Sequence, residues 1–120
     1  MSECIFCKIA NKEIPAEIIK GNDEFAAFPD INPKAPIHIL IVPKSHIGSI
    51  STLSASEIPM LGLIIDFARS LAKEQCISES GFRLIFNSGR DAGMEVDHLH
   101  LHLLGGATLG SLSNIGNVPK

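Results

Sequence analysis

The sequence predicts an α+β fold in a single domain. Short apolar segments bounded by turn residues indicate several strands, and one longer segment has the periodicity of a helix. Strand-rich chains with one long helix and hairpins are typical of the α+β class. The 120 residues are enough for one domain and short for two, so we expect these elements to share one core.

The N-terminal third predicts a short helix followed by a hairpin. Residues 4–12 place isoleucines four positions apart, on one side of a helix, and the Ile-Pro-Ala sequence at 14–16 ends it. Residues 17–20 and 25–28 predict short strands. The intervening Gly-Asn-Asp at 21–23 is typical of a hairpin turn.

The middle of the chain predicts a rigid loop, a central strand and an outer strand. Two prolines stiffen residues 30–36 because each fixes its own φ and restricts the preceding residue. Residues 37–42 are apolar on both faces apart from His38, as expected for a central strand. Residues 82–86 predict another apolar strand, nearly unbroken in its apolarity.

The clearest helix is predicted between Ser54 and Cys76. Ser54 to Glu57 matches a capping box, but Pro59 is comfortable only in the first helical turn, which favours a start at Ser56. Cys76 is expected to be a small buried residue at the helix end. The expected buried stripe steps by three and four and consists of Ile58, Leu61, Ile65, Ala68 and Ala72.

Three histidines alternate with leucine in His98-Leu99-His100-Leu101-His102. If residues 96–104 form a strand, all three imidazoles line one face. A fold does not need a row of groups that titrate near neutrality, so the row indicates a catalytic or anion-binding site. Metal ligation and a structural role remain as alternatives. In an unbent strand the outer two histidines lie about 13 Å apart, too far to share one metal.

Composition excludes several classes of protein. The formal net charge of −3 provides no basic field for nucleic acid. No apolar run approaches the roughly 20 residues of a membrane span, and the first residues have neither region of a signal peptide. Three cysteines, an odd number, fit a reducing compartment better than a disulfide framework. We therefore expect a cytoplasmic protein without a nucleic-acid or membrane partner.

Several of these motifs resemble one known family. Ala35-Pro36-Ile37-His38, the Asn87 that precedes a glycine loop, and His98-x-His100-x-His102-Leu103-Leu104-Gly105-Gly106 resemble the histidine-triad (HIT) superfamily. The closing Gly-Gly resembles its Hint branch, the purine nucleoside phosphoramidases. The similarity runs over nearly the whole chain, so we predict a single HIT domain at 1–106 and a loosely ordered tail at 107–120.

The resemblance implies an architecture and an activity. The architecture is an antiparallel sheet of about five strands with one long helix and a short N-terminal helix. Two subunits would form a homodimer in which the sheets join. The activity is hydrolysis of nucleoside phosphoramidates at the P–N bond, through a covalent nucleotidyl-histidine, to a purine nucleoside monophosphate and an amine.

The resemblance also implies catalytic roles. His100 matches the nucleophile, and a neutral imidazole does offer a lone pair near pH 7. His38, on the neighbouring strand, is expected to orient the other ring nitrogen of His100. His102 would bind the phosphate oxygens and the leaving group, where positioned donors are the main catalytic tool. His98 completes the row.

A nucleotide pocket is implied by further matches. Asp30 matches an acid that accepts hydrogen bonds from the ribose. The phosphate would meet Asn87 and backbone N–H groups of a glycine-containing turn. The carboxylate of Glu95 would repel phosphate, so only its backbone is expected to contribute. The turn comprises Gly93, Met94 and Glu95, and the apolar slot for the base comprises Phe6, Ile9, Ile14 and Ile31.

The N-terminal Cys4-x-x-Cys7 is a weak signal by itself. Some bacterial members of the resembled family hold a structural zinc with this pair, a histidine after Pro-Lys, and the first triad histidine. Cys4, Cys7, His46 and His98 match those positions and would form a closed Cys₂His₂ site. Thiols without a metal, and redox chemistry, remain as alternatives.

Two other functions stay open. The same covalent route would serve hydrolysis of diadenosine polyphosphates or adenylyl sulfate. A non-enzymatic nucleotide-binding or interaction module stabilised by zinc is the second alternative. The histidine triad favours an enzyme, and the Gly-Gly ending favours a phosphoramidase.

Overall fold

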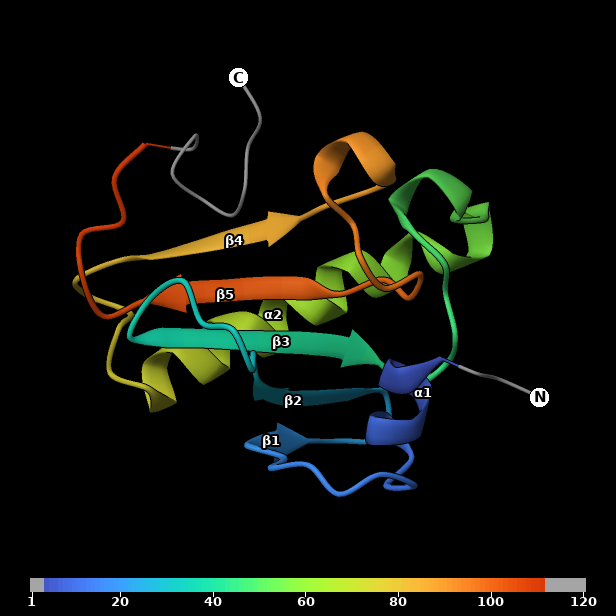
Figure 1. Cartoon of the computed structure of the whole chain (residues 1–120), viewed down its shortest axis with the longest axis horizontal. Coiled ribbons are helices and arrows are strands. Elements are labelled where there is room, and N and C mark those ends of the chain that lie inside the picture. The colour runs from blue at the N-terminus through green and yellow to red at the C-terminus, as the bar shows by residue number, and fades with distance from the viewer. Residues whose placement is uncertain (1–3, 112–120) are drawn as a thin grey trace.

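The computed structural model describes residues 4–111, which form an α+β fold with one five-stranded antiparallel sheet. The strand order is β1-β2-β3-β5-β4, with β3 in the middle. The long helix α2 packs behind the sheet, and the short helix α1 lies over the other face at the end of β3 (Figure 1). The elements are α1 (Ile5–Ala10), β1 (Lys20–Gly21), β2 (Phe25–Pro29), β3 (Ile37–Pro43), α2 (Pro59–Glu74), β4 (Phe82–Phe86) and β5 (Leu101–Gly105).

The central position predicted for residues 37–42 is confirmed, since β3 pairs with β2 on one side and β5 on the other. Its alternate side chains enter two separate cores. Ile39 and Ile41 pack towards α2, and Leu40 and Val42 pack towards α1. The apolarity of both faces of β3 therefore follows from a helix on each side.

The capping box and the proline serve two different elements. Ser54 and Glu57 cap a 3₁₀ turn, Ala55–Glu57, and Pro59 stands in the first turn of α2. The predicted helix start at Ser56 is therefore wrong, because the α-helix begins at the proline, whose missing N–H costs nothing there.

The buried stripe of α2 is also shifted from the prediction. Ala68 and Ala72 are buried as expected, but Ile58 is 50% exposed and Ile65 is 44% exposed. The helix is apolar around much of its circumference, so its periodicity alone did not select one face. Cys76 is exposed, with φ of 61°, rather than buried. The buried residues of α2 are Ile64, Phe67, Ala68, Leu71 and Ala72.

The predicted strand at 96–104 is wrong in its first half. Residues 96–98 form a bend, and β5 begins at Leu101. The N–H of His98 donates to the carbonyl of Val96 at 2.8 Å, and the N–H of Leu99 donates to the carbonyl of Ile47 at 2.6 Å. These two bonds, one local and one to a residue distant in sequence, take the place of the sheet ladder. The strand predicted at 17–20 is likewise reduced to Lys20–Gly21.

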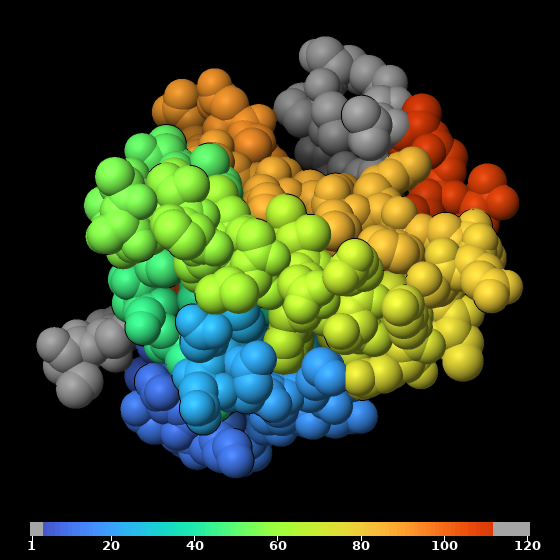
Figure 2. Space-filling view, turned by 180° about the vertical axis from the view of Figure 1, so that it is seen from behind, coloured from blue at the N-terminus to red at the C-terminus, as the bar shows by residue number. Residues whose placement is uncertain are grey.

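Seen from behind, α2 lies across the surface of the molecule (Figure 2). Leu63 and Ile65 on this helix are 49% and 44% exposed. Edge strand β4 is half-buried along its length. Among the helices of residues 4–111, none is both long and apolar enough to cross a membrane. Residues 107–111 have no helix or strand, and residues 112–120 of the predicted tail lie outside the described residues.

Candidate active site

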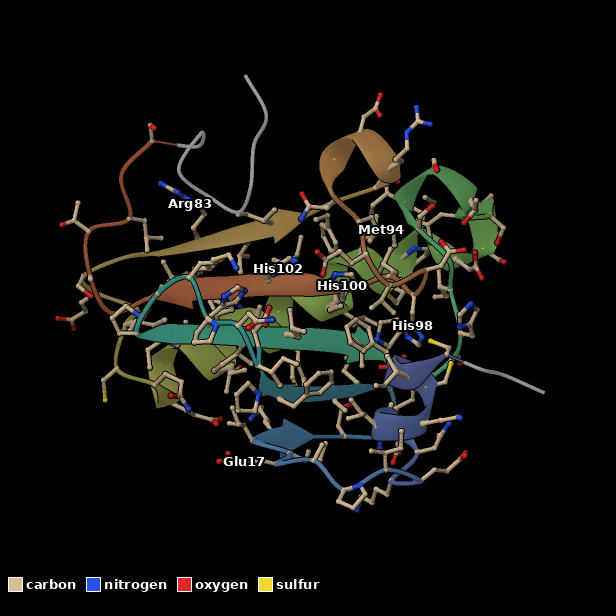
Figure 3. The ribbon with its side chains drawn as sticks, viewed as in Figure 1. Glu17, Arg83, Met94, His98, His100 and His102 are labelled. Carbon is tan, nitrogen blue, oxygen red and sulfur yellow. The ribbon has the colours of Figure 1, made fainter. Side chains whose placement is uncertain are left out.

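His100 and His102 lie on the face of the sheet that points away from α2 (Figure 3), and His38 shares that face. His38 on β3 stands opposite Leu104, and His102 on β5 stands opposite Leu40, so both side chains share one face. His100 lies directly before β5, with its ring centroid 5.1 Å from that of His102. We call His38, His100 and His102 the histidine face. The alternating leucines are buried on the α2 side, so the leucine side of the predicted two-sided pattern is confirmed.

A main-chain carbonyl orients the His100 ring. Nδ1 of His100 lies 2.7 Å from the carbonyl oxygen of His98. Because a carbonyl only accepts, Nδ1 carries the proton and Nε2 keeps a lone pair. The prediction that His38 orients this ring is wrong, because the carbonyl of His98, in the bend at 96–98, bonds to Nδ1 of His100, and His38 bonds to His102 instead. Phe6 packs edge-on against the same ring, with centroids 5.0 Å apart.

His38 instead orients His102. The N–H of Lys34 donates to Nδ1 of His38 at 3.0 Å, so the proton of a neutral His38 sits on Nε2. That nitrogen lies 2.9 Å from Nδ1 of His102 and 3.4 Å from Oδ2 of Asp30. His102 therefore accepts at Nδ1, and its Nε2–H is a donor.

Burial keeps these rings neutral. Desolvation lowers the pKa of His102 from 6.5 to about 4, and the neighbouring His100 and His38 lower it further against an opposing effect of Asp30. Desolvation likewise lowers the pKa of His38, with Asp30 again opposing. At pH 7 His102 is thus a neutral hydrogen-bond donor, suited to hold phosphoryl oxygens.

The turn predicted to bind phosphate follows β4 and Asn87. A 3₁₀ turn, Arg90–Ala92, ends at Gly93 with φ of 82°, a conformation that favours glycine. Two of the three predicted donors are engaged within the turn, because Gly93 N–H donates to Arg90 O and Met94 N–H to Gly89 O. Of the three predicted N–H donors, only that of Glu95 is left to bind a phosphate, as judged within residues 4–111.

The residues predicted to hold the nucleoside are partly brought together. Asp30 lies beside His38, with its Oδ1 accepting from the N–H of Asn32 at 2.8 Å. Phe6 touches His100, and Ile9 packs in the same small core as Phe6. Ile31 is 91% exposed next to Asp30. Ile14 is half-buried at the end of the α1 region and lies outside both described cores.

The ring of His98 belongs to a second group of donors, which we call the thiol cluster. Its Nδ1 lies 3.2 Å from Sγ of Cys4 and 3.3 Å from Sγ of Cys7. Nδ1 of His46 lies 3.1 Å from Sγ of Cys7. The four ligand atoms lie within 4.8 Å of one another. The expected row of three histidines is thus divided, because the bend turns the first ring away from the other two.

The thiol cluster fits a tetrahedral metal ion. With bonds of about 2.3 Å to sulfur and about 2.0 Å to nitrogen, donors on one zinc lie about 3.5 Å apart, close to the observed separations. The Nε2–H of His98 donates to the carbonyl of Pro43 at 2.9 Å. That bond leaves the lone pair of Nδ1 directed at the sulfurs, as in metal-bound histidines. The four residues could hold a metal ion.

Sequence reasoning missed three backbone groups and one cation. The N–H of Lys34 and the carbonyls of Pro43 and His98 select the tautomers, and no residue-type pattern marks them. Arg83 on β4 stands opposite Leu104, on the same face as His38. It donates to the carbonyl of Gly110 at 2.8 Å. Its charge, inside an otherwise apolar strand, was the sequence signal that could have marked it.

Comparisons with known proteins identify the family and agree with this fold. The family model described as "Scavenger mRNA decapping enzyme C-term binding" matches residues 3–115. A purine nucleoside phosphoramidase of Escherichia coli K12 is 46% identical over 110 residues, 92% of this chain and 92% of that protein. The chain therefore belongs to the histidine-triad (HIT) family of hydrolases, as its motifs predicted.

Solved structures of the family confirm the predicted fold. A histidine triad protein from Clostridium difficile superposes with a TM-score of 0.90 at 44% identity, covering 92% of this chain and 96% of that one. A HIT family hydrolase from Legionella pneumophila gives 0.87 at 44% identity, covering 90% and 96%.

Proposed function

We propose that the protein hydrolyses the P–N bond of purine nucleoside phosphoramidates through a covalent nucleotidyl-His100. The observation that carries the proposal is the pair of fixed tautomers: a lone pair on Nε2 of His100 beside the Nε2–H donor of His102. A nucleophile and a charge-stabilising donor are the groups that in-line phosphoryl transfer requires. The similarity to a purine nucleoside phosphoramidase supports this substrate class.

The first step forms a bond between Nε2 of His100 and phosphorus and breaks the P–N bond. The amine leaves with the electron pair of that bond and takes a proton from solvent. The carbonyl of His98 keeps the Nδ1 proton and stabilises the positive charge that the attacked ring acquires. His102 donates to a phosphoryl oxygen, since its low pKa makes it a poor proton store.

The second step returns the enzyme to its starting state. Water attacks phosphorus, the bond to Nε2 of His100 breaks, and the nucleoside monophosphate leaves with the oxygen of water. The displaced electron pair restores the neutral ring, and the proton of water passes to solvent. We propose that Asp30 accepts from the ribose, that Ile31, Phe6, Ile9 and Ile14 hold the base, and that Asn87 and the N–H of Glu95 meet the phosphate.

We also propose that the metal of the thiol cluster is zinc. Two thiolates and two imidazoles are a donor set that zinc prefers, and a four-donor set is of the closed, structural type. Zinc would fix the start of α1 against the end of β3. Because such a site needs Cys4 and Cys7 reduced, it supports the cytoplasm as the compartment.

A homodimer is proposed from the apolar surface that one subunit leaves uncovered. Leu63 and Ile65 of α2 are about half exposed, and β4 is an edge strand with an unpaired side. Two-fold pairing would cover both in one isologous interface. Sedimentation at micromolar concentration should show twice the 12.9 kDa chain mass, and Leu63→Glu should shift it towards the monomer. A folded monomer in the parent protein would refute the dimer.

The activity is tested by mixing the protein with an adenosine phosphoramidate and measuring amine release together with the intact protein mass. We expect release of amine and a protein carrying one nucleotidyl group. His102→Ala should retain the adduct because the nucleophile is intact, whereas His100→Ala should not form it. A diadenosine polyphosphate and adenylyl sulfate serve as comparison substrates. Faster turnover of either would replace the proposed substrate class.

A further inference from the structure

We infer that the thiol cluster positions the nucleophile, so that Cys4, Cys7 and His46 control the reactivity of His100 without touching substrate. The inference rests on the proposed function and extends it, because it gives the metal ligands a role beyond holding the fold. Two short connections join the thiol cluster to His100. One runs through the main chain, and the other runs through α1.

The first connection is the carbonyl of His98. The His98 ring is fully buried and held at both nitrogens, by Pro43 at Nε2 and by the two sulfurs at Nδ1. Residues 96–98 lie in a bend outside the sheet ladder, so no strand pairing fixes the direction of this carbonyl. Two restraints fix it instead: the anchored ring, and the N–H of Leu99 in the same peptide group, which donates at 2.6 Å to the carbonyl of Ile47, next to the ligand His46. The same carbonyl accepts the Nδ1–H of His100 at 2.7 Å and thereby selects the nucleophilic tautomer.

The second connection is Phe6, which lies between the two cysteines on α1. Its ring is 8% exposed and packs edge-on against His100, with centroids 5.0 Å apart. Helix α1 has only six residues, too few to be stable without tertiary contacts. Its N-cap is Cys4, whose sulfur accepts from the N–H of Cys7 at 3.4 Å. The position of Phe6 therefore depends on where the two sulfurs are held.

Loss of the metal should act on His100 through both connections. Once the sulfurs no longer share an ion with His98 and His46, the bend and α1 lose their common anchor. The carbonyl of His98 then no longer enforces the Nδ1–H tautomer, and a fraction of His100 carries its proton on Nε2. That form has no lone pair for attack on phosphorus. The expected loss in kcat is about fivefold or more, the factor that one net hydrogen bond contributes.

The test follows the His100 tautomer by ring ¹⁵N NMR in the full chain, alongside kcat and KM for an adenosine phosphoramidate. The four samples are zinc-loaded protein, chelated protein, Cys7→Ser, and Ala10→Gly as the matched control. Ala10→Gly weakens the same helix but leaves every ligand atom in place. We expect one Nδ1–H tautomer in the zinc-loaded protein and in Ala10→Gly. Chelated protein and Cys7→Ser should show mixed tautomers and a lower kcat with a smaller change in KM.

Restoring zinc should recover the tautomer and kcat of the chelated protein but not those of Cys7→Ser. An unchanged tautomer and kcat in metal-free protein would overturn the inference, as would a wild-type protein that binds no zinc. Equal losses in Ala10→Gly at matched stability would also overturn it, since general loosening would then explain them. If Cys7→Ser does not fold, the chelated protein supplies the same comparison. Absence of turnover in the zinc-loaded protein refutes the proposed function alone, because the tautomers are read without substrate.

Discussion

Two groups of histidines lie side by side on one face of the sheet and are built for different chemistry. In the thiol cluster, His98 is fully buried and its lone pair faces two sulfurs. On the histidine face, the lone pair of His100 and the N–H of His102 remain available at Nε2. In both groups a main-chain carbonyl holds one ring nitrogen, so the choice of nitrogen decides whether a ring suits a metal or a phosphate.

Proximity of donor atoms alone does not separate the two groups. Asp30, His38 and His102 also bring three ligand atoms within 4.8 Å of one another. There, however, a proton already fills the gap, because Nε2 of His38 donates to Nδ1 of His102. A metal would have to displace that proton. The thiol cluster offers four donor atoms, two of them soft sulfurs, which suits a metal ion. On the histidine face a chain of hydrogen bonds runs from the N–H of Lys34 through His38 to His102.

The largest expected effect belongs to the histidine face. His100→Ala should lower turnover by about 10³-fold or more, since it removes the atom that attacks phosphorus. Zinc content, melting temperature and binding of nucleoside monophosphate should stay close to those of the parent. Steady-state kinetics, metal analysis and calorimetry measure these quantities. Near-normal turnover would remove His100 from the nucleophile's role.

The reciprocal experiment removes a ligand from the thiol cluster. Cys4→Ser or Cys7→Ser should release zinc and lower the melting temperature by roughly 5 °C or more, because metal binding contributes folding free energy. Cys76→Ser is the control, since Cys76 is exposed at the end of α2 and far in sequence from the cluster. Metal analysis and thermal unfolding read the outcome. Chelated protein that unfolds at the parent's temperature would show that no metal stabilises the fold.

The contrast between the groups also explains what the sequence revealed. Apolar residues on both faces predicted β3 as the central strand, and the alternation of histidine with leucine placed His100 and His102 on one face, since both inferences depend only on strand geometry. The bend at 96–98 was not predictable, because it depends on Leu99 bonding to Ile47 and on His98 being drawn to sulfurs distant in sequence. Those are tertiary interactions without a local signal.

The orientation of each ring was the second feature beyond reach. A family resemblance led to the prediction of His100 as nucleophile, yet the partner that orients its ring is a carbonyl two residues earlier. Every residue carries a carbonyl and all but proline an N–H, so main-chain partners leave no trace in composition. The shifted stripe on α2 has a related cause, because apolar residues on several sides of a helix permit more than one face.

The titration of His102 on the histidine face should make the free energy of unfolding depend on pH, an effect smaller than those of the two substitutions above. The pKa of folded His102 is lowered to about 4 from an ordinary 6.5, so between these values the unfolded chain binds a proton that the folded chain excludes. The free energy of unfolding should therefore fall as the pH falls from about 6.5 to about 4, by up to about 1.4 kcal/mol per pH unit. Above pH 6.5 this contribution is fully present.

Urea unfolding at several pH values, in wild type and His102→Gln, isolates this contribution. The variant lacks the titrating ring, so its curve should be flatter across the same window. His98, whose lowered pKa does not have His102 among its causes, contributes equally to both curves and cancels in the difference, whereas any change at His38, which is hydrogen-bonded to His102, is part of the measured contribution. Parallel curves would mean that His102 titrates alike in the folded and unfolded chains.

The smallest expected effect comes from two charged residues, the exposed Lys34 and the half-buried Asp30, which act on the histidine face but not on the thiol cluster. The cation of Lys34 lowers the pKa of His38 and of His102, whereas the carboxylate of Asp30 raises both. Lys34→Ala should therefore raise these two pKa values and Asp30→Asn should lower them. Solvent and salt screen such charges, so both shifts should shrink at high ionic strength.

His98 has neither residue among the causes of its own lowered pKa. In an NMR titration its resonances should not respond to either variant. Shifts of the same sign in both variants would contradict the opposite effects assigned to the two charges. An equal response of His98 would show that the thiol cluster and the histidine face are one electrostatic unit.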